Sequence, residues 1–393
     1  MVEQGGNSTS FKEASKQFQR NLSVNIGPKE TQRLTEQIGQ QWSAARDEQV
    51  EQFKQGKLAR LHGQAPQAAV VMVDGGRTQI RADEAGAGVH EAGWREVKYA
   101  SLATLASRVS TTDPTPEPPS KLLNPERVKK IVEQMHDQHV PVRKQVAATL
   151  AAKKRKSQRR KPFNRRITRL ITTFVATMQH SEQFGYMVAT ETFLRSLDRA
   201  ERKAYVCDGL PYNWSVYEAH FRASGFVPIL DFLHLLGYLY AAAHALEHES
   251  TWRAWQCYER WLRWAWGGER QALVSALQAA SAKVGLPPKG APEQDRRAIV
   301  LRAFDYVANN YDRIDYPRYR KLGLPCSSAP IESAVKQFSR RVKGSEKFWL
   351  ESGAEAVLQV RAACLSQDDR IDRLWTYPLD EHAYGTNWRN IAS

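Results

Sequence analysis

The sequence predicts an α/β fold, a mixed sheet flanked by helices and interrupted by a basic insertion and an all-helical insertion. Short apolar runs rich in β-branched residues alternate with segments of helical periodicity, a pattern typical of strands and helices in one sheet. A proline-rich break followed by clustered basic residues separates the first strands from the later ones. A tryptophan-rich helical stretch then lies between the last apolar run and a late helix.

Composition limits the partners of the chain. Its 393 residues exceed one small domain, and 57 Lys+Arg against 42 Asp+Glu give a formal charge of +15. Such an excess favours a polyanionic partner, of which nucleic acid is the commonest. The most apolar stretch, 229–246, contains Asp231, His234 and His244, so we expect no membrane partner and no membrane span. Without a secretion signal or paired cysteines, we expect a cytoplasmic, nucleoid-associated protein.

The first elements are predicted as follows. Residues 1–65 are polar and helical in pattern, with a disordered beginning, and form an N-terminal helical arm. The first part of the core spans 66–245. Its first strand is the apolar run 68–73, which ends in Asp74-Gly75-Gly76. Turn glycines and β-branched residues predict that two or three antiparallel strands begin here, including 95–100.

A basic insertion is predicted at 113–166. It opens with four prolines within seven residues, which exclude regular structure at that point. Helical patterning resumes near Asn124, with Pro125 well placed for a first helical turn. The basic run 153–166 is equally compatible with a DNA contact and with a solvated helix end or loop.

Strands and helices alternate after this insertion. A helix is expected at 181–197, an apolar strand at 204–207, a short helix at 213–221 and a further apolar strand at 226–230. This alternation indicates parallel pairing.

An all-helical insertion is predicted at 246–325. Its tryptophans at 252, 255, 261 and 264 have the spacing of a buried helix face. The second part of the core follows at 326–370, and a C-terminal tail at 371–393.

Three apolar runs end in an aspartate: Asp74, Asp208 and Asp231. A carboxylate within a sheet core is costly, whereas one at the carboxyl end of a strand faces a crevice. Neighbouring strands of this kind bring carboxylates together, and hard oxygen ligands suit Mg²⁺ or Mn²⁺. For a single Asp-Gly pair, an ordinary turn is the commoner explanation.

Glu332 is the third candidate ligand. The segment Ser327-Ser328-Ala329-Pro330 indicates a helix start with a serine cap and a proline in the first turn. The helix dipole favours a charged carboxylate there. Basic residues follow on the same helix, with Lys336 and Arg340 at i+4 and i+8, and such a stripe suits a phosphate backbone. Ordinary i, i+4 pairing on an exposed helix explains the same spacing.

A competing motif is the segment 244–248, whose His-Ala-Leu-Glu-His sequence matches the H-x-x-E-H pattern of inverted zinc peptidases. Two histidines at this spacing on a helix bind zinc, with the glutamate as general base. The sequence identifies no third ligand, and proteolysis leaves the basic charge unexplained.

The ordered motifs resemble those of bacterial insertion-sequence DDE transposases, a group related to Mutator-type transposases. The resemblance covers about residues 68–370. The segments that carry it are Val73-Asp74-Gly75, Gly93-Trp94-Arg95-Glu96-Val97-Lys98, Val206-Cys207-Asp208-Gly209, Leu230-Asp231-Phe232-Leu233-His234, Ile331-Glu332-Ser333, 340–349 and Val360-Arg361-Ala362.

The resemblance implies an RNase H-like core in which Asp74, Asp208 and Glu332 are catalytic and bind Mg²⁺ or Mn²⁺. It implies a supporting role for Asp231 and His234, although an alternative registration makes Asp231 the second catalytic aspartate. Two-metal phosphoryl transfer would cleave the ends of an insertion sequence and join them to target DNA. The residues expected to contact DNA are Lys98, Lys336, Arg340, Arg341, Lys343 and Trp349; for Trp349 a role as a core anchor is equally open.

The predicted function is therefore a DNA transposase acting in DNA recombination. Synapsis of two element ends implies at least a homodimer on DNA. Two alternatives stay open at this point. One is an RNase H-like nuclease or resolvase that cuts without joining. The other is a domesticated or inactive DNA-binding protein.

Overall fold

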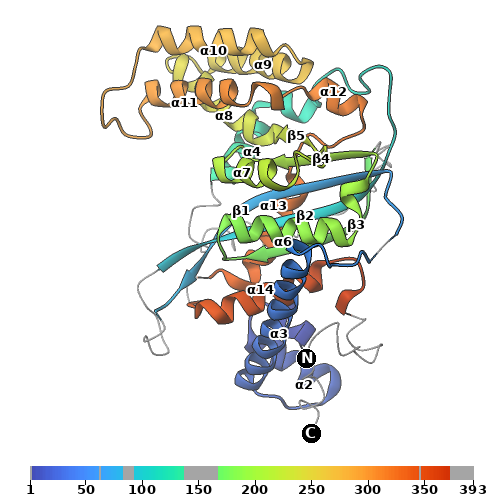
Figure 1. Cartoon of the computed structure of the whole chain (residues 1–393). Coiled ribbons are helices and arrows are strands. Elements are labelled where there is room, and N and C mark those ends of the chain that lie inside the picture. Colours follow the sequence, from blue (N-terminus) through green and yellow to red (C-terminus); the bar gives the residue numbers. More distant parts are fainter. Residues whose placement is uncertain (1, 62, 83–92, 137–166, 345–346, 372–393) are drawn as a thin grey trace.

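The computed structural model describes residues 2–61, 63–82, 93–136, 167–344 and 347–371. Figure 1 shows a central sheet with helices on both faces. A group of helices lies beyond one edge of the sheet, and the N-terminal helices lie beyond the other. The class predicted from the sequence, a mixed sheet flanked by helices, is confirmed.

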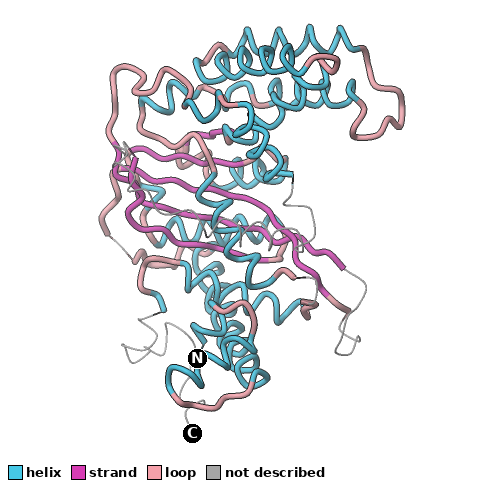
Figure 2. The backbone as a smooth tube through the Cα atoms, turned by 180° about the vertical axis from the view of Figure 1, so that it is seen from behind, coloured by secondary structure: helices cyan, strands magenta, loops and turns pink. Residues whose placement is uncertain are grey.

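The sheet has five strands in the order β3-β2-β1-β4-β5 (Figure 2). The strands are β1 (Ala68–Ile80), β2 (Gly93–Ser107), β3 (Ile167–Thr177), β4 (Arg202–Cys207) and β5 (Val227–Leu230). β2 pairs antiparallel with β1 and with β3, while β4 pairs parallel with β1 and with β5. The predicted parallel pairing of the later strands is therefore confirmed.

The helices that cover the sheet come from distant parts of the sequence. Those near the core are α3 (Pro28–Lys54), α6 (Ser181–Leu194), α7 (Pro211–His220), α13 (Ala329–Val342) and α14 (Glu351–Leu365). α13 packs on β1 and β2, and α14 packs on β3 and on α3. α6 lies on the opposite face of the sheet from α13 (Figure 1).

The N-terminus is ordered, contrary to the prediction of a disordered beginning. It forms α1 (Val2–Asn7) and α2 (Phe11–Leu22), and α1 packs against α14. Glycines allow this contact, since a Cβ on Gly6 would lie 2.6 Å from a methyl carbon of Val360. The segment is ordered because its small residues pack against α14. The polar sequence of the segment does not predict this packing.

The proline-rich segment that opens the predicted basic insertion is docked on the helices beyond β5. Arg320 forms an ion pair with Asp113, and the indole Nε1 of Trp266 donates to the carbonyl of Thr115 at 2.8 Å. A short 3₁₀ turn, Ser120–Leu123, leads to α4 (Pro125–His136), which begins at the proline as predicted. The basic run 153–166 lies outside the described residues, and β3 follows directly after it.

The all-helical insertion comprises α9 (Thr251–Gly267), α10 (Arg270–Val284), α11 (Arg296–Asn309) and α12 (Tyr316–Lys321). The helix that precedes it, α8 (Phe232–Leu246), begins directly after β5 and packs on α9 and α11. The helical unit therefore starts earlier than the predicted boundary at 246. No helix within the described ranges is both long enough and apolar enough to cross a membrane.

Candidate active site

Asp74 lies within β1, directly after a run of six buried residues that begins at Ala68. Its side chain is 6% exposed, and its Oδ1 accepts a hydrogen bond from the backbone N–H of Gly75 at 2.8 Å. Its Oδ2 is buried and has no hydrogen-bond partner among the described residues. A buried carboxylate oxygen without a donor is costly unless a ligand satisfies it.

Asp208 follows the last residue of β4, the parallel neighbour of β1. Because Met72 is paired with Val206, the two strands reach the same edge of the sheet two residues later, at Asp74 and Asp208. The Oδ1 of Asp208 accepts from the backbone N–H of Leu210 at 3.1 Å and from the side-chain amide of Asn213 at 2.7 Å. These two donors fix the orientation of the carboxylate.

Glu332 lies in the first turn of α13, after Pro330 and with Ser328 at the N-cap position. The position of the helix start is confirmed, but the Ser328 side chain makes no capping hydrogen bond. Instead, its backbone N–H donates to Oδ1 of Asp231 at 2.8 Å, which ties the start of α13 to the end of β5. The Oε1 of Glu332 is buried and lacks a partner among the described residues.

The carboxylates are close enough to perturb one another. Burial raises the pKa of Asp74 from 3.8 to about 7, and the negative charge of Asp208 adds to the increase, as does that of Glu332 to a smaller extent. Burial and the charge of Asp231 raise the pKa of Glu332, while Lys336 opposes this. Concentrated negative charge with unsatisfied oxygens is the electrostatic environment that a divalent cation stabilises.

Asp231 differs from the other two aspartates because both of its oxygens are engaged. It is fully buried, and its Oδ2 accepts from the backbone N–H of His234 at 3.1 Å and lies 2.6 Å from the ring Nδ1 of His234. Burial would raise the pKa of Asp231, but these hydrogen bonds and the charge of His234 lower it. Burial lowers the pKa of His234, but Asp231 and the other carboxylates outweigh this and raise it to about 9.

One cluster among the described residues is close enough to offer three ligands to a single metal ion. Ligand atoms of Asp231, His234 and Glu332 all lie within 4.8 Å of one another. In that set, both oxygens of Asp231 already accept hydrogen bonds, and the raised pKa of His234 disfavours the neutral imidazole that binds a metal. Buried oxygens without a hydrogen-bond partner among the described residues belong to Asp74 and Glu332. Asp74 and Asp208 lie near this cluster, since their negative charges help to raise the pKa of His234.

Four of the predicted DNA-contacting residues lie on β2, on α13 or directly after α13. Lys98 is paired with Gly75 across β1 and β2, and its ammonium group lies 3.0 Å from Glu96. Lys336 and Arg340 are exposed on α13, and Lys343 is partly buried, 5.6 Å from the centre of the Trp94 ring.

Arg341 and Trp349 are buried, as is Lys98 at 7% exposure, and in this position neither Arg341 nor Trp349 offers its side chain to DNA. Arg341 is 2% exposed, and its Nε donates to the carbonyl of Gly5 at 2.7 Å. Trp349 is 7% exposed, and its indole Nε1 donates to the carbonyl of Val342 at 2.8 Å. Burial against the N-terminal helices turns these residues inward, so the structure places Trp349 as a core anchor.

Sequence reasoning missed the residues that hold the Asp208 loop. Besides Asn213, these include Tyr306 of α11, whose hydroxyl donates to the carbonyl of Asp208 at 2.6 Å. Gly209 has a φ of +90° and packs against the same tyrosine ring, so a side chain there would be strained and would clash. The Asp208-Gly209 pair indicates a turn in the sequence itself, whereas the contact from α11 depends on the tertiary structure.

Two other regions do not resemble a catalytic site. α8 ends at Leu246, so His248 of the H-x-x-E-H motif lies beyond the helix and cannot share a helical face with His244.

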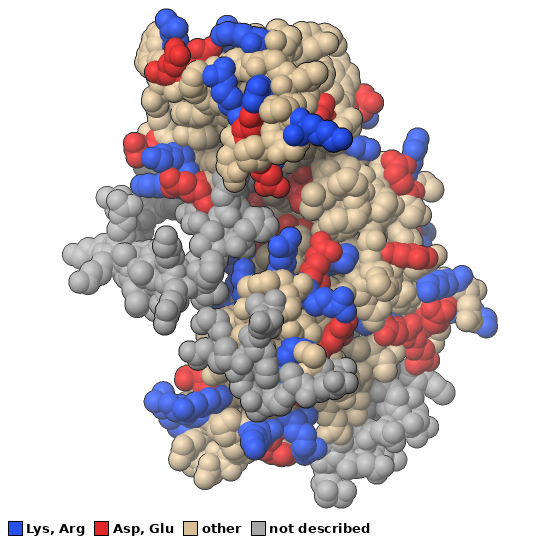
Figure 3. Space-filling model, turned by 90° about the vertical axis from the view of Figure 1, so that its left-hand side faces the viewer, with Lys and Arg blue, Asp and Glu red and all other residues tan. Residues whose placement is uncertain are grey.

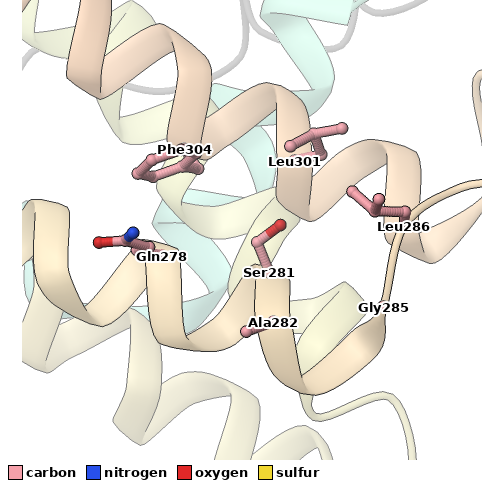
Figure 4. A pocket seen from close by; sticks show the side chains of 7 residues that line it. All are labelled: Gln278, Ser281, Ala282, Gly285, Leu286, Leu301 and Phe304. Atoms are coloured by element: carbon pink, nitrogen blue, oxygen red, sulfur yellow. The ribbon is translucent and has the colours of Figure 1, made fainter.

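A recess between α10 and α11 is lined by apolar or neutral side chains, including Leu301 and Phe304 (Figure 4). No residue that lines it is titratable, so it offers no acid, base or metal ligand.

The surface charge is distributed over several elements. On the side shown in Figure 3, Lys and Arg side chains alternate with Asp and Glu over the helical insertion and around the sheet.

No protein-family model and no curated protein matches the sequence. The assignment of a function therefore depends on the fold and on the site.

Proposed function

We propose that the protein is a metal-dependent DNA transposase with an RNase H-like core, in which Asp74, Asp208 and Glu332 form the catalytic centre. The order and direction of the five strands support an RNase H-like core: three antiparallel strands precede two that are parallel to β1. The sequence motifs provide the family resemblance, and the basic charge of the chain supports a DNA substrate.

The observation that carries the proposal is that the negative charges of Asp208 and Glu332 both act on the buried Asp74, so the three carboxylates lie near one another. They come from β1, from the end of β4 and from the first turn of α13, and buried oxygens of Asp74 and Glu332 lack a partner among the described residues. Without a bound ligand, these buried and unpaired oxygens would destabilise the folded protein. The same observation favours an enzyme over a protein that only binds DNA.

When bound, Mg²⁺ or Mn²⁺ would supply Lewis-acid activation and charge neutralisation for phosphoryl transfer. Asp74, Asp208 and Glu332 would hold the ion. Asn213 and the N–H of Leu210 keep the Asp208 carboxylate oriented.

Asp231 is a positioning residue in this scheme. It joins the start of α13 to His234 and thereby fixes the distance between Glu332 and the sheet. We assign the second catalytic aspartate to Asp208, because the oxygens of Asp231 are occupied by N–H donors.

The test uses a plasmid that carries the native DNA flanking the gene. Wild-type protein and the Asp208→Asn and Asp312→Asn variants are incubated with Mg²⁺ or Mn²⁺, and cut and joined ends are mapped. Asp312 is the matched control because its side chain is 95% exposed and its nearest charged partner is Arg270, at 3.9 Å. We expect cleavage and joining at the element ends with wild type and Asp312→Asn, and neither with Asp208→Asn.

Equal activity of Asp208→Asn would contradict the assignment of the catalytic centre. Cleavage without any joining would identify a nuclease or resolvase. Binding without cleavage by any of the three proteins would identify a DNA-binding protein.

A further inference from the structure

Beyond the end of β4, the strands β1 and β2 continue as a two-stranded extension. β4 pairs with β1 only as far as Met72, whereas β1 and β2 stay paired as far as Ile80. The two strands extend past the helices that cover the sheet (Figures 1 and 2). The extension begins directly after Asp74, so it adjoins the carboxylate centre.

Trp94 is an exposed residue of this extension, with 45% of its surface accessible. It pairs with Gln79, and Glu96 pairs with Arg77. Paired residues share a face of the sheet, and side chains alternate along each strand, so Trp94 and Arg77 lie on the same face. Thr78 points to the opposite face, where its hydroxyl contacts the end of α13. The face that carries Trp94 is therefore not the one covered by α13.

Basic side chains lie close to the exposed indole ring. The Lys343 ammonium group is 5.6 Å from the centre of the ring. Arg77 is exposed, and its cross-strand partner Glu96 forms an ion pair with Lys98 at 3.0 Å. Burial lowers the pKa of Lys343, and the charge of Arg77 lowers it further. The two cations repel each other, and an anion at the surface would relieve this repulsion.

An exposed indole ring flanked by cations suits a single strand of DNA. Tryptophan offers a large apolar face on which a base can stack. The bases of a duplex already stack on one another, so an unpaired base is the better partner. Guanidinium and ammonium groups attract the phosphates of the same strand.

We propose that Trp94 and Arg77 form a contact surface for single-stranded DNA beside the carboxylate centre. Trp94 stacks on an unpaired base, and Arg77 contacts a phosphate of the same strand. This inference rests on the proposed function, since it takes DNA as the substrate, and it adds that the DNA is single-stranded where it meets the extension.

Photocrosslinking locates the contact directly. Wild-type protein is irradiated with a single-stranded oligonucleotide that carries 5-iodouracil, which links to an aromatic ring stacked on it, and the linked peptide is identified by mass spectrometry. Trp252, which is 67% exposed on α9, is the internal control. We expect a crosslink at Trp94 and none at Trp252. No crosslink at Trp94, or an equal yield at Trp252, would overturn the inference.

Affinity for the oligonucleotide is then compared between variants of the two exposed tryptophans. Trp94→Ala should bind it roughly five- to a hundredfold less well, while Trp94→Phe, which keeps an aromatic ring, should retain most of the affinity. Trp252→Ala should bind like wild type. Because Trp94 is exposed, the thermal unfolding midpoint of Trp94→Ala should stay that of wild type.

The contribution of Arg77 is separated from that of the ring by the salt dependence of binding. Arg77→Gln should lower the slope of log affinity against log salt by roughly 0.7, the value for one phosphate contact of a single strand. Arg253→Gln, an exposed arginine beside Trp252, should keep the wild-type slope. Equal losses in the α9 variants, or an equal loss of single-strand and duplex affinity in Trp94→Ala, would overturn the inference.

The two proposals fail separately, because binding of a single strand requires no cleavage. If wild-type protein cuts no DNA but crosslinks through Trp94, the proposed function fails and the contact surface stands. If wild-type protein cuts and joins element ends while Trp94→Ala binds the single strand with full affinity, the inference fails alone.

Discussion

Replacement of Asp74 by asparagine should stabilise the metal-free protein at neutral and alkaline pH. Asparagine has nearly the same shape, and its carbonyl oxygen can still accept the hydrogen bond from Gly75. What the substitution removes is a negative charge at a position where the side chain is only 6% exposed. We therefore expect the variant to be more stable than wild type and to lose catalytic activity.

The magnitude follows from the pKa of Asp74, which is 3.8 ordinarily and about 7 in the folded protein. Between these values the unfolded chain releases a proton that the folded chain retains, so the free energy of unfolding falls as pH rises. The shift corresponds to a destabilisation of the folded protein by about 4 kcal/mol, which is present in full above pH 7 and absent below pH 3.8. The gain from Asp74→Asn should therefore shrink to about 1–2 kcal/mol at pH 5.

The assay is urea unfolding in EDTA at pH 8 and pH 5, with Asp231→Asn as the matched control. Hydrogen bonds from His234 and Ser328 lower the pKa of Asp231, so that variant should lose stability. A lower unfolding midpoint for Asp74→Asn than for wild type at pH 8 would refute the argument. An equal gain at both pH values would show that charge burial is not its cause.

Two further effects follow from the same structure. Because Asp231 raises the pKa of His234 to about 9, this pair should stabilise the metal-free protein fully below pH 6.5 and lose that contribution as pH rises through 9. In Asp231→Asn, an NMR titration should show the His234 pKa lowered by roughly one unit or more; an unchanged pKa would contradict the role of Asp231. Gly39→Ala places a Cβ 2.2 Å from the carbonyl oxygen of Ala356, so it should cost roughly 1–3 kcal/mol by separating α3 from α14. Gly63→Ala, with open space around it and outside any helix, should leave the thermal unfolding midpoint unchanged.

The sequence predicts the strands that support the candidate site because their signals are local. The runs 68–73 and 204–207 are entirely apolar. Each ends at an aspartate that is followed by a glycine. Parallel pairing of β1 and β4 then follows from the alternation of strands and helices. The start of α13 was equally visible, from its serines and proline.

The contacts between distant segments were not predictable in this way. β3 follows the basic run directly, and residues 167–171 are mostly exposed, so no apolar run marks where it begins. The prediction that Arg341 contacts DNA assumed that its side chain faces solvent. Its burial depends on Gly5 and Phe11, more than 300 residues earlier in the sequence.

Measurement of Mn²⁺ binding is the most direct test of the proposed centre. Free Mn²⁺ would be titrated by electron paramagnetic resonance in the presence of element-end DNA, for wild type and for Asp208→Asn, Glu332→Gln, His234→Gln and Asp312→Asn. We predict that binding is strongly weakened in Asp208→Asn and Glu332→Gln and is retained in Asp312→Asn and largely in His234→Gln. Full Mn²⁺ affinity in Asp208→Asn, together with loss of binding in His234→Gln, would contradict the account and place the metal at the Asp231–His234–Glu332 cluster instead.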